Sequence, residues 1–221
     1  MISPFMAGKT TSERCDVASR SRLKLSDRKH LLKQIAEGMA YLHGEKVVHG
    51  DLRGPNVFLT TTGDVKIADF GLCVYASGVS QNYFSMRTGN TRWIAPELMN
   101  TNSVQDEGLR QERERLELEN ARDPDRITIN RPTISSDVYS FACTCIELID
   151  GRVPYYDQKT DPAVIRFVTI ENGRPPRPRE LSGTHDDTVL WEIIQRCWAS
   201  VESGSLRPTF AEVYKQLGRV V

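Results

Sequence analysis

Hydrophobic side chains recur at helical spacing through the segment RKHLLKQIAEGMAYLHGEK, residues 28–46. The apolar face is made of Leu31, Leu32, Ile35, Ala36, Met39 and Leu42. A stripe of this kind predicts a helix with one buried face. Ser26 or Asp27 is expected to cap its start and Gly44 to end it. His43 near the end is expected to be structural.

Short runs of β-branched residues follow, and they predict a hairpin. NVFLT (56–60) and VKIAD (65–69) are separated by TTGD, in which Thr62-Gly63 suits a two-residue turn. Pairing the strands around that turn places Asn56 opposite Asp69. Amide and carboxylate oxygens are hard ligands, so this arrangement predicts a shared cation such as Mg²⁺ at the open end of the hairpin.

The second half of the chain is patterned for helices. SSDVYSFACTCIELIDG (135–151) is strongly apolar, with serines that suit a cap and a glycine that suits an end. Three further helices are expected. One starts at Asp161-Pro162, one runs through VLWEIIQRCW (189–198), and the last follows RPTFAEVYKQLG with Pro208 in its first turn.

Composition and charge narrow the function classes. Lys and Arg total 29 and Asp and Glu total 29, so the formal net charge is zero, which argues against nucleic-acid or anionic-membrane partners. The five cysteines show no C-x-x-C spacing, which favours free thiols in a reducing compartment. No apolar run reaches the roughly 20 residues of a membrane span. The expected setting is the cytoplasm. The segment at about 101–131 is rich in both charges, which indicates a solvated insertion.

The stretch VVHGDLRGPNVFL (47–59) carries the candidate chemistry. Phosphoryl transfer needs a carboxylate for the attacking hydroxyl, metal ligands to neutralise phosphate charge, and a cation near the transferring group. Asp51 is the candidate carboxylate and Arg53 the cation. Asn56 and Asp69 are the candidate metal ligands. His49, between Val48 and a glycine, is expected to be a packed, hydrogen-bonded core residue.

Several motifs, in order, make the sequence similar to the large lobe of eukaryotic-type protein kinases. They are HGDLRGPN at 49–56, which resembles H-R-D-L-x-x-x-N, DFG at 69–71, APE at 95–97, SDVYSFACTCIEL at 136–148 and RPTF at 207–210. The resemblance implies a protein-kinase-like C-terminal lobe of the α+β family. Such a lobe is mainly α-helical, with a small β-hairpin that carries the metal-binding residues. It also implies that Asp137 anchors the catalytic-loop backbone and that Arg207 pairs with Glu97.

The function implied by this resemblance is ATP- and Mg²⁺-dependent phosphoryl transfer to Ser/Thr hydroxyls of a protein substrate, with Tyr left open. Asp51, Arg53 and Asn56 would be catalytic, and the same three with Asp69 would bind the cofactor. Asn56 and Asp69 would hold the metal, and His49, Phe70 and Asp137 would be scaffolding. The segment GNTRWIAPE (89–97) is closest to tyrosine-kinase-like Ser/Thr kinases.

Departures from the family pattern shape further expectations. Gly50 replaces an arginine that in many kinases pairs with a phosphorylated activation-loop residue, so activation without that phosphate clamp is expected. Arg53 stands where Ser/Thr kinases usually carry lysine, and Asn90 interrupts the usual Gly-Thr pair. Aminoglycoside and choline kinases share H-G-D and the following Asn, but they lack an A-P-E segment, so this alternative is less favoured.

No G-x-G-x-x-G or V-A-I-K pattern precedes Asp51, and MISPFMA resembles the last small-lobe strand and hinge. Residues 1–27 are therefore expected to be a hinge-like remnant and polar linker, and 28–221 the large lobe. Without a partner chain that supplies the phosphate-covering lobe, little turnover is expected. The alternative is a catalytically inactive interaction module, a pseudokinase or fragment, with a partner at the exposed inter-lobe face.

Overall fold

The computed structural model describes residues 23–60, 62–69, 74–75, 90–99, 132–181, 183–199 and 206–220. The predictions for the hinge-like segment, for Phe70 and for the insertion at about 101–131 concern residues outside these ranges. The division into linker and lobe therefore stays a prediction.

Helix α3 spans Leu25–Gly44 and buries the predicted apolar face. It ends at Gly44 as expected, but its N-cap is Lys24, so the prediction that Ser26 or Asp27 caps it is wrong. Asp27 instead lies in the first turn, where its Oδ2 accepts the Lys24 N–H at 3.1 Å. A carboxylate in this place satisfies a backbone donor from inside the helix, which explains why the helix begins earlier than the pattern suggested.

Helix α5 (Ile134–Asp150) is buried from Ser136 to its last residue. Its N-cap is Thr133, whose Oγ1 accepts the Ser136 N–H at 3.0 Å while the Ser136 Oγ accepts the Thr133 N–H at 2.8 Å. The predicted serine cap is thus wrong, because the N-cap is a threonine. Ser136 takes part in the capping box, but as the third residue of the helix. The predicted glycine end is confirmed, since Gly151 has a φ of 70° and closes the helix in the left-handed region.

Three more helices follow, as expected: α6 (Asp161–Thr169), α7 (His185–Cys197) and α8 (Phe210–Leu217). The start of α6 at Asp161 is confirmed. Pro208, however, does not lie in the first turn of α8. Thr209 is the N-cap, and its side chain accepts the Glu212 N–H. Pro208 therefore precedes the cap, and the helix begins at Phe210.

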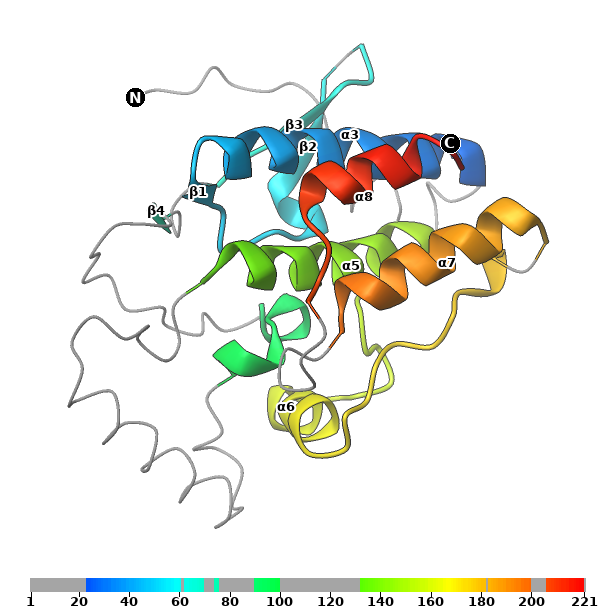
Figure 1. The fold of residues 1–221 in the computed structure, drawn as a ribbon. Coiled ribbons are helices and arrows are strands. Elements are labelled where there is room, and N and C mark those ends of the chain that lie inside the picture. Colours follow the sequence, from blue (N-terminus) through cyan, green and yellow to red (C-terminus); the bar gives the residue numbers. More distant parts are fainter. Residues whose placement is uncertain are drawn as a thin grey trace.

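The helices pack around α5. Figure 1 shows α3 and α8 lying side by side across one side of α5, with α7 beside α5 and α6 at the far end of the molecule. Large side chains of this core that are almost fully buried include Leu32, Met39, Leu52, Tyr139, Phe141 and Phe210. Helix α5 is therefore the buried axis against which the loops of the site are placed.

Two small antiparallel pairs accompany the helices: β1 (Val47–Val48) with β4 (Val74–Tyr75), and β2 (Val57–Leu59) with β3 (Val65–Ile67). The predicted hairpin exists, but its register is shifted by one residue. Val57 faces Ile67, and the Ala68 N–H donates to the Asn56 carbonyl at 2.9 Å. Asn56 therefore lies opposite Ala68 and not opposite Asp69.

The turn explains the shift. The Thr60 N–H donates to the Asp64 carbonyl, so three residues lie between the paired positions instead of the two assumed. Gly63 has a φ of 90°, which fits the left-handed position that ends a three-residue hairpin loop.

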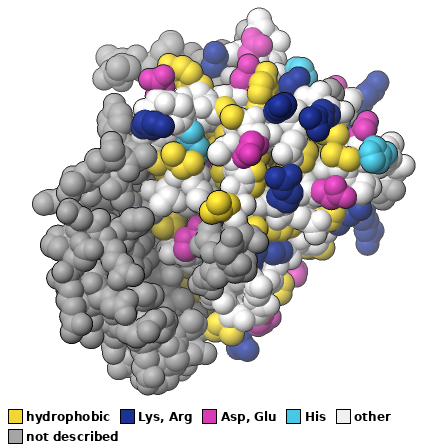
Figure 2. Space-filling view, in the orientation of Figure 1, with side chains coloured by type: hydrophobic (Ala, Val, Ile, Leu, Met, Phe, Trp, Pro, Cys, Tyr) yellow, Lys and Arg dark blue, Asp and Glu magenta, His cyan; other side chains and the backbone are white. Residues whose placement is uncertain are grey.

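The charged side chains on the surface and the state of the described cysteines fit the zero net charge and the cysteine spacing of the sequence. Figure 2 shows basic and acidic side chains interspersed among the described residues of the face in view. Among the described helices, none is long and apolar enough to cross a membrane.

The described cysteines, Cys143, Cys145 and Cys197, are free and buried, and burial raises the pKa of the Cys143 and Cys197 thiols to about 12. These thiols stay protonated and act as core side chains.

Candidate active site

A carboxylate of α5 holds the loop that follows β1. The Asp137 Oδ2 accepts the His49 N–H at 2.8 Å, and the Asp137 Oδ1 accepts the Gly50 N–H at 2.9 Å. The His43 Nε2 lies 2.9 Å from the same Oδ2. Asp137 is almost fully buried, so these donors replace its water and fix the loop backbone. The predicted anchoring role of Asp137 and the structural role of His43 are confirmed.

His49 joins this loop to the hairpin. Its side chain is fully buried, its Nδ1 accepts the Asp51 N–H at 3.2 Å, and its Nε2 lies 3.1 Å from the Ala68 carbonyl. Since Nδ1 accepts and a carbonyl cannot donate, the proton belongs on Nε2. The expectation of a packed, hydrogen-bonded histidine is confirmed.

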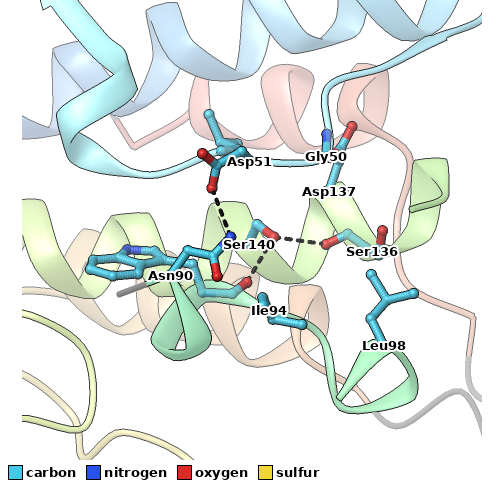
Figure 3. Close-up of a pocket in the computed structure, with 10 residues that line it drawn as sticks. Gly50, Asp51, Asn90, Ile94, Leu98, Ser136, Asp137 and Ser140 are labelled. Carbon is cyan, nitrogen blue, oxygen red and sulfur yellow. Dashed lines mark hydrogen bonds between the residues drawn. The ribbon is translucent and has the colours of Figure 1, made fainter. Parts of the chain in front are cut away.

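The Asp51 carboxylate is contacted on both oxygens. The Asn56 Nδ2 donates to the Asp51 Oδ2 at 3.0 Å and to the Asp51 backbone carbonyl at 2.8 Å. The Asp51 Oδ1 lies 3.4 Å from the Arg53 Nε and 3.4 Å from the Asn90 Nδ2. Asp51 is only 5 % exposed. The structure thus brings Asp51, Arg53 and Asn56 together and adds Asn90, which Figure 3 shows below the carboxylate.

A second carboxylate of α5 supports the other side of the loop. The Glu147 Oε2 accepts the Gly54 N–H at 2.9 Å and the Trp93 Nε1–H at 3.0 Å. A Cβ atom at Gly54 would lie 2.7 Å from that carboxylate, so only glycine permits this close approach. The Arg53 guanidinium lies 5.9 Å from the centre of the Trp93 ring, which places its charge over an aromatic face.

Asp69 comes directly after the residue that faces Asn56. It is exposed, and its φ of 63° takes the chain out of extended geometry. Strand alternation therefore does not set the direction of its side chain, and the predicted pairing of Asp69 with Asn56 through the hairpin register is wrong. Its role as a metal ligand stays a prediction.

Asn90, Trp93 and Glu147 were not singled out as site residues from the sequence. A usable signal existed for Glu147, because an acidic residue inside an otherwise apolar helix is rarely buried without partners. Asn90 was noted only as a departure from the family's Gly-Thr pair, and no pattern pointed to Trp93, since the contacts of both residues join segments that are distant in sequence.

The turn that carries Asn90 and Trp93, η3 (Thr91–Trp93), is followed by η4 (Pro96–Leu98). Glu97 in η4 forms the predicted pair with Arg207. The Arg207 Nη1 and Nη2 lie 2.6 and 3.0 Å from the two carboxylate oxygens, a bidentate geometry. This prediction is confirmed.

Comparison with known families identifies the class of protein. A model described as "Protein kinase domain" matches residues 1–108, and one described as "Protein tyrosine and serine/threonine kinase" matches residues 120–217. Both describe the same family of phosphotransferases. The chain therefore belongs to the protein kinase family, and its fold is the protein kinase fold.

Individual relatives agree with this assignment. The chain is 32% identical over 159 residues to the cytokinesis protein sepH of Aspergillus terreus. This match covers 72% of this chain and 9% of that protein. It is 32% identical over 151 residues both to MAP3K epsilon protein kinase 1 of Arabidopsis thaliana and to a probable serine/threonine-protein kinase of Dictyostelium discoideum. Those matches cover 68% of this chain, and 9% and 24% of the respective relatives. The chain thus spans less than two thirds of the length of each.

Proposed function

We propose that the site performs ATP-dependent phosphoryl transfer to Ser or Thr hydroxyls of proteins. The observation that carries the proposal is the buried Asp51 carboxylate, which amide and guanidinium groups contact on both oxygens. A carboxylate held in this way is oriented to accept a proton from an attacking hydroxyl. Arg53 is the cation that would contact the γ-phosphate.

Asn56 and Asp69 are proposed to hold Mg²⁺. The Asn56 Nδ2 is already engaged with two Asp51 oxygens, so the amide oxygen of Asn56 is the atom that remains for a cation. One amide and one carboxylate suit Mg²⁺, which takes its other ligands from phosphate and water. Among the described residues, no group of three or more His, Cys, Asp or Glu side chains lies close enough together to hold a metal ion. When bound, the ion neutralises phosphate charge.

The preference for Ser/Thr over Tyr rests on relatives and on sequence. One relative carries the name of a probable serine/threonine-protein kinase, and the segment around Trp93 resembles tyrosine-kinase-like Ser/Thr kinases. The protein substrate, the cytoplasmic setting and activation independent of a phosphate clamp at Gly50 are parts of the same proposal. The buried free thiols fit a reducing compartment.

The test separates nucleotide binding from transfer. Mg·ATP should raise the melting temperature of the 221-residue chain, and Asp69→Ala should abolish most of that rise because one metal ligand is lost. Asp64→Ala, in the hairpin turn, is the matched control and should keep it. Transfer of ³²P from ATP to a mixture of Ser- and Tyr-containing peptides then reports the acceptor. No melting shift in the parent chain would contradict the proposal.

An inactive interaction module is the second candidate. It is favoured by two departures from the family pattern in the catalytic loop: Gly50 stands where many kinases carry arginine, and Arg53 where Ser/Thr kinases usually carry lysine. In this case a protein partner binds the inter-lobe face. Partner binding that is unaffected by Asp51→Asn, together with absent transfer, would favour this candidate.

A further inference from the structure

The loop between α5 and α6 exposes a guanidinium stacked on an aromatic ring (Figure 1). The Arg152 Cζ lies 3.7 Å from the centre of the Tyr156 ring. Both groups are accessible, since Tyr156 is 40 % exposed and the Arg152 side chain 46 %. Val153, in the same loop, is also exposed. These three side chains, here called the loop platform, have no role in the function proposed so far.

The guanidinium of the loop platform is held in one orientation. The Arg152 Nε donates to the Asp150 Oδ2 at 2.6 Å, and the Arg152 Nη2 donates to the Asp150 Oδ1 at 3.0 Å. Asp150 is the last residue of α5 and is almost fully buried, so the helix fixes its place. A carboxylate on one edge and a ring on one face leave the guanidinium little freedom, which lowers the entropy that binding would cost.

The backbone that presents Tyr156 is strained. Tyr155, the residue before it, has a φ of 55°, a left-handed conformation that is costly for a bulky side chain. Its side chain is buried, with its hydroxyl 2.7 Å from the Tyr139 hydroxyl. Such strain persists only where the surroundings enforce it, and it clusters at functional positions. Here it places one tyrosine in the core and the next on the surface.

The loop platform is joined to the candidate active site through η3. The Arg92 guanidinium donates to three carbonyls of this loop, those of Pro154, Tyr155 and Gln158. Trp93, the next residue of η3, donates to the Glu147 carboxylate that supports the loop of Asp51. The loop platform is therefore fixed relative to Asp51. A protein whose hydroxyl reaches Asp51 continues beyond that residue, and a fixed neighbouring surface can bind its other side chains.

We propose that the loop platform binds an aromatic side chain of the protein substrate, at a position other than the acceptor residue. The inference rests on the proposed function. Asp150 balances the Arg152 charge, and the exposed Asp157 follows Tyr156, so an acidic side chain would meet negative charge. A basic side chain would meet the guanidinium. An aromatic ring can pack against Tyr156 and Val153 and interact with the cation, and Tyr and Arg are the residue types that dominate binding at interfaces.

The first arm of the test is kinetic. A peptide that the parent chain phosphorylates is made as a series with Phe or Ala at each position around the acceptor. At one position or more, Phe should lower KM by about fivefold relative to Ala, with kcat unchanged, because the contact is remote from the reacting atoms. Tyr156→Ala should remove this preference and Tyr156→Phe should keep it. Tyr41→Ala, which removes an exposed tyrosine of α3, is the matched control and should keep it.

The second arm does not require turnover. In ¹H–¹⁵N spectra, the Arg152 Nε–H signal is assigned by its absence in Arg152→Lys. It should move when the parent chain is titrated with the Phe peptides and stay in place with the Ala peptides, because an aromatic ring shifts the resonances of protons beside it. In Tyr156→Ala neither titration should move it. The melting temperature of Tyr156→Ala, expected to be close to that of the parent, reports whether the variant is folded.

The outcomes separate the inference from the proposed function. Transfer without a Phe preference, or with one that survives in Tyr156→Ala, overturns the inference alone. A lower KM for a peptide with Glu in place of Phe also overturns it. So does a parent chain that self-associates in sedimentation while Tyr156→Ala stays monomeric, because the loop platform then binds a second copy. Absent transfer together with an Arg152 signal that responds to Phe peptides counts against the proposed function and supports the aromatic contact.

Discussion

Gly50, next to Asp51, has a backbone conformation that favours glycine. Its φ of 79° lies in the left-handed region, and its N–H donates to Asp137. A side chain at this position would strain the backbone next to Asp51. The glycine that replaces the family's usual arginine therefore removes strain as well as a positive charge, and both consequences follow from one change.

Gly50→Ala should lower the free energy of unfolding by about 1 kcal/mol, because alanine is disfavoured at positive φ. Urea denaturation measures the difference. Gly44→Ala is the matched control, since a Cβ there meets nothing within 4 Å and Gly44 ends a helix. It should be neutral or slightly stabilising. Equal loss in both variants would show that left-handed strain is not the cause.

Helices α3 and α7 are joined by a buried ion pair. The Lys29 Nζ lies 2.8 Å from the Asp187 Oδ1, while the Asp187 Oδ2 accepts the Gly183 and Thr184 N–H groups that precede α7. Burial alone would raise the pKa of Asp187. The hydrogen bonds from Lys29 and Thr184 outweigh it and hold that pKa below its ordinary value.

The pH dependence of stability follows from the direction of this shift. A lowered folded pKa stabilises the protein above the unfolded pKa of about 4, and this stabilisation is lost as the pH falls through the folded value. Asp187→Asn should therefore be less stable than the parent at pH 7, with a shallower decline between about pH 5 and pH 3 in urea titrations. Asp186→Asn removes a charge from the same turn but leaves the Lys29–Asp187 pair intact. Its free energy of unfolding should therefore fall with decreasing pH as that of the parent does.

The elements show how far sequence patterns reach. Periodicity predicted the helices because each buries one apolar stripe or, for α5, nearly its whole length. The helix caps and the hairpin register were predicted wrongly because each depends on one local hydrogen bond or turn conformation. Thr133, and not one of the serines that follow it, is the N-cap of α5. Gly63 adopts a positive φ, which gives the hairpin a three-residue loop instead of a two-residue loop. One residue of error in such a loop moves every facing pair.

At the scale of the whole molecule, Arg207 connects segments that are remote in sequence. Besides Glu97, it donates to the carbonyls of Ser135 and Ala199, and its guanidinium lies 5.1 Å from the centre of the Tyr139 ring. The Arg207 side chain is fully buried. One planar cation thus joins η4, the start of α5 and the end of α7.

Arg207→Lys should lower the free energy of unfolding by about 2 kcal/mol or more, because one ammonium cannot reproduce a bidentate pair and two carbonyl contacts. Chemical denaturation provides the measurement. Arg196→Lys, which replaces an exposed arginine bonded to Gln216, is the control and should change stability by less than about 0.5 kcal/mol. If Arg207→Lys proved as stable as the control variant, this account of the buried guanidinium would be contradicted.

The candidate site was only partly predictable for a related reason. Asp51, Arg53 and Asn56 lie within one short motif, so their proximity could be inferred from the sequence. Asn90 and Glu147 reach that motif from other segments, and only the packing of η3 and α5 brings them there. Long-range contacts to a known loop leave no periodic signature in the chain.

The imidazole of His49 bridges two peptide groups, that of Asp51 and that of the residue before Asp69. Its ring is rigid, so displacement of Ala68 would change the hydrogen bond at the Asp51 backbone nitrogen. If Asp69 holds Mg²⁺ and Asp51 accepts the proton, as proposed, binding of the ion and alignment of the acceptor hydroxyl would be coupled through this one imidazole.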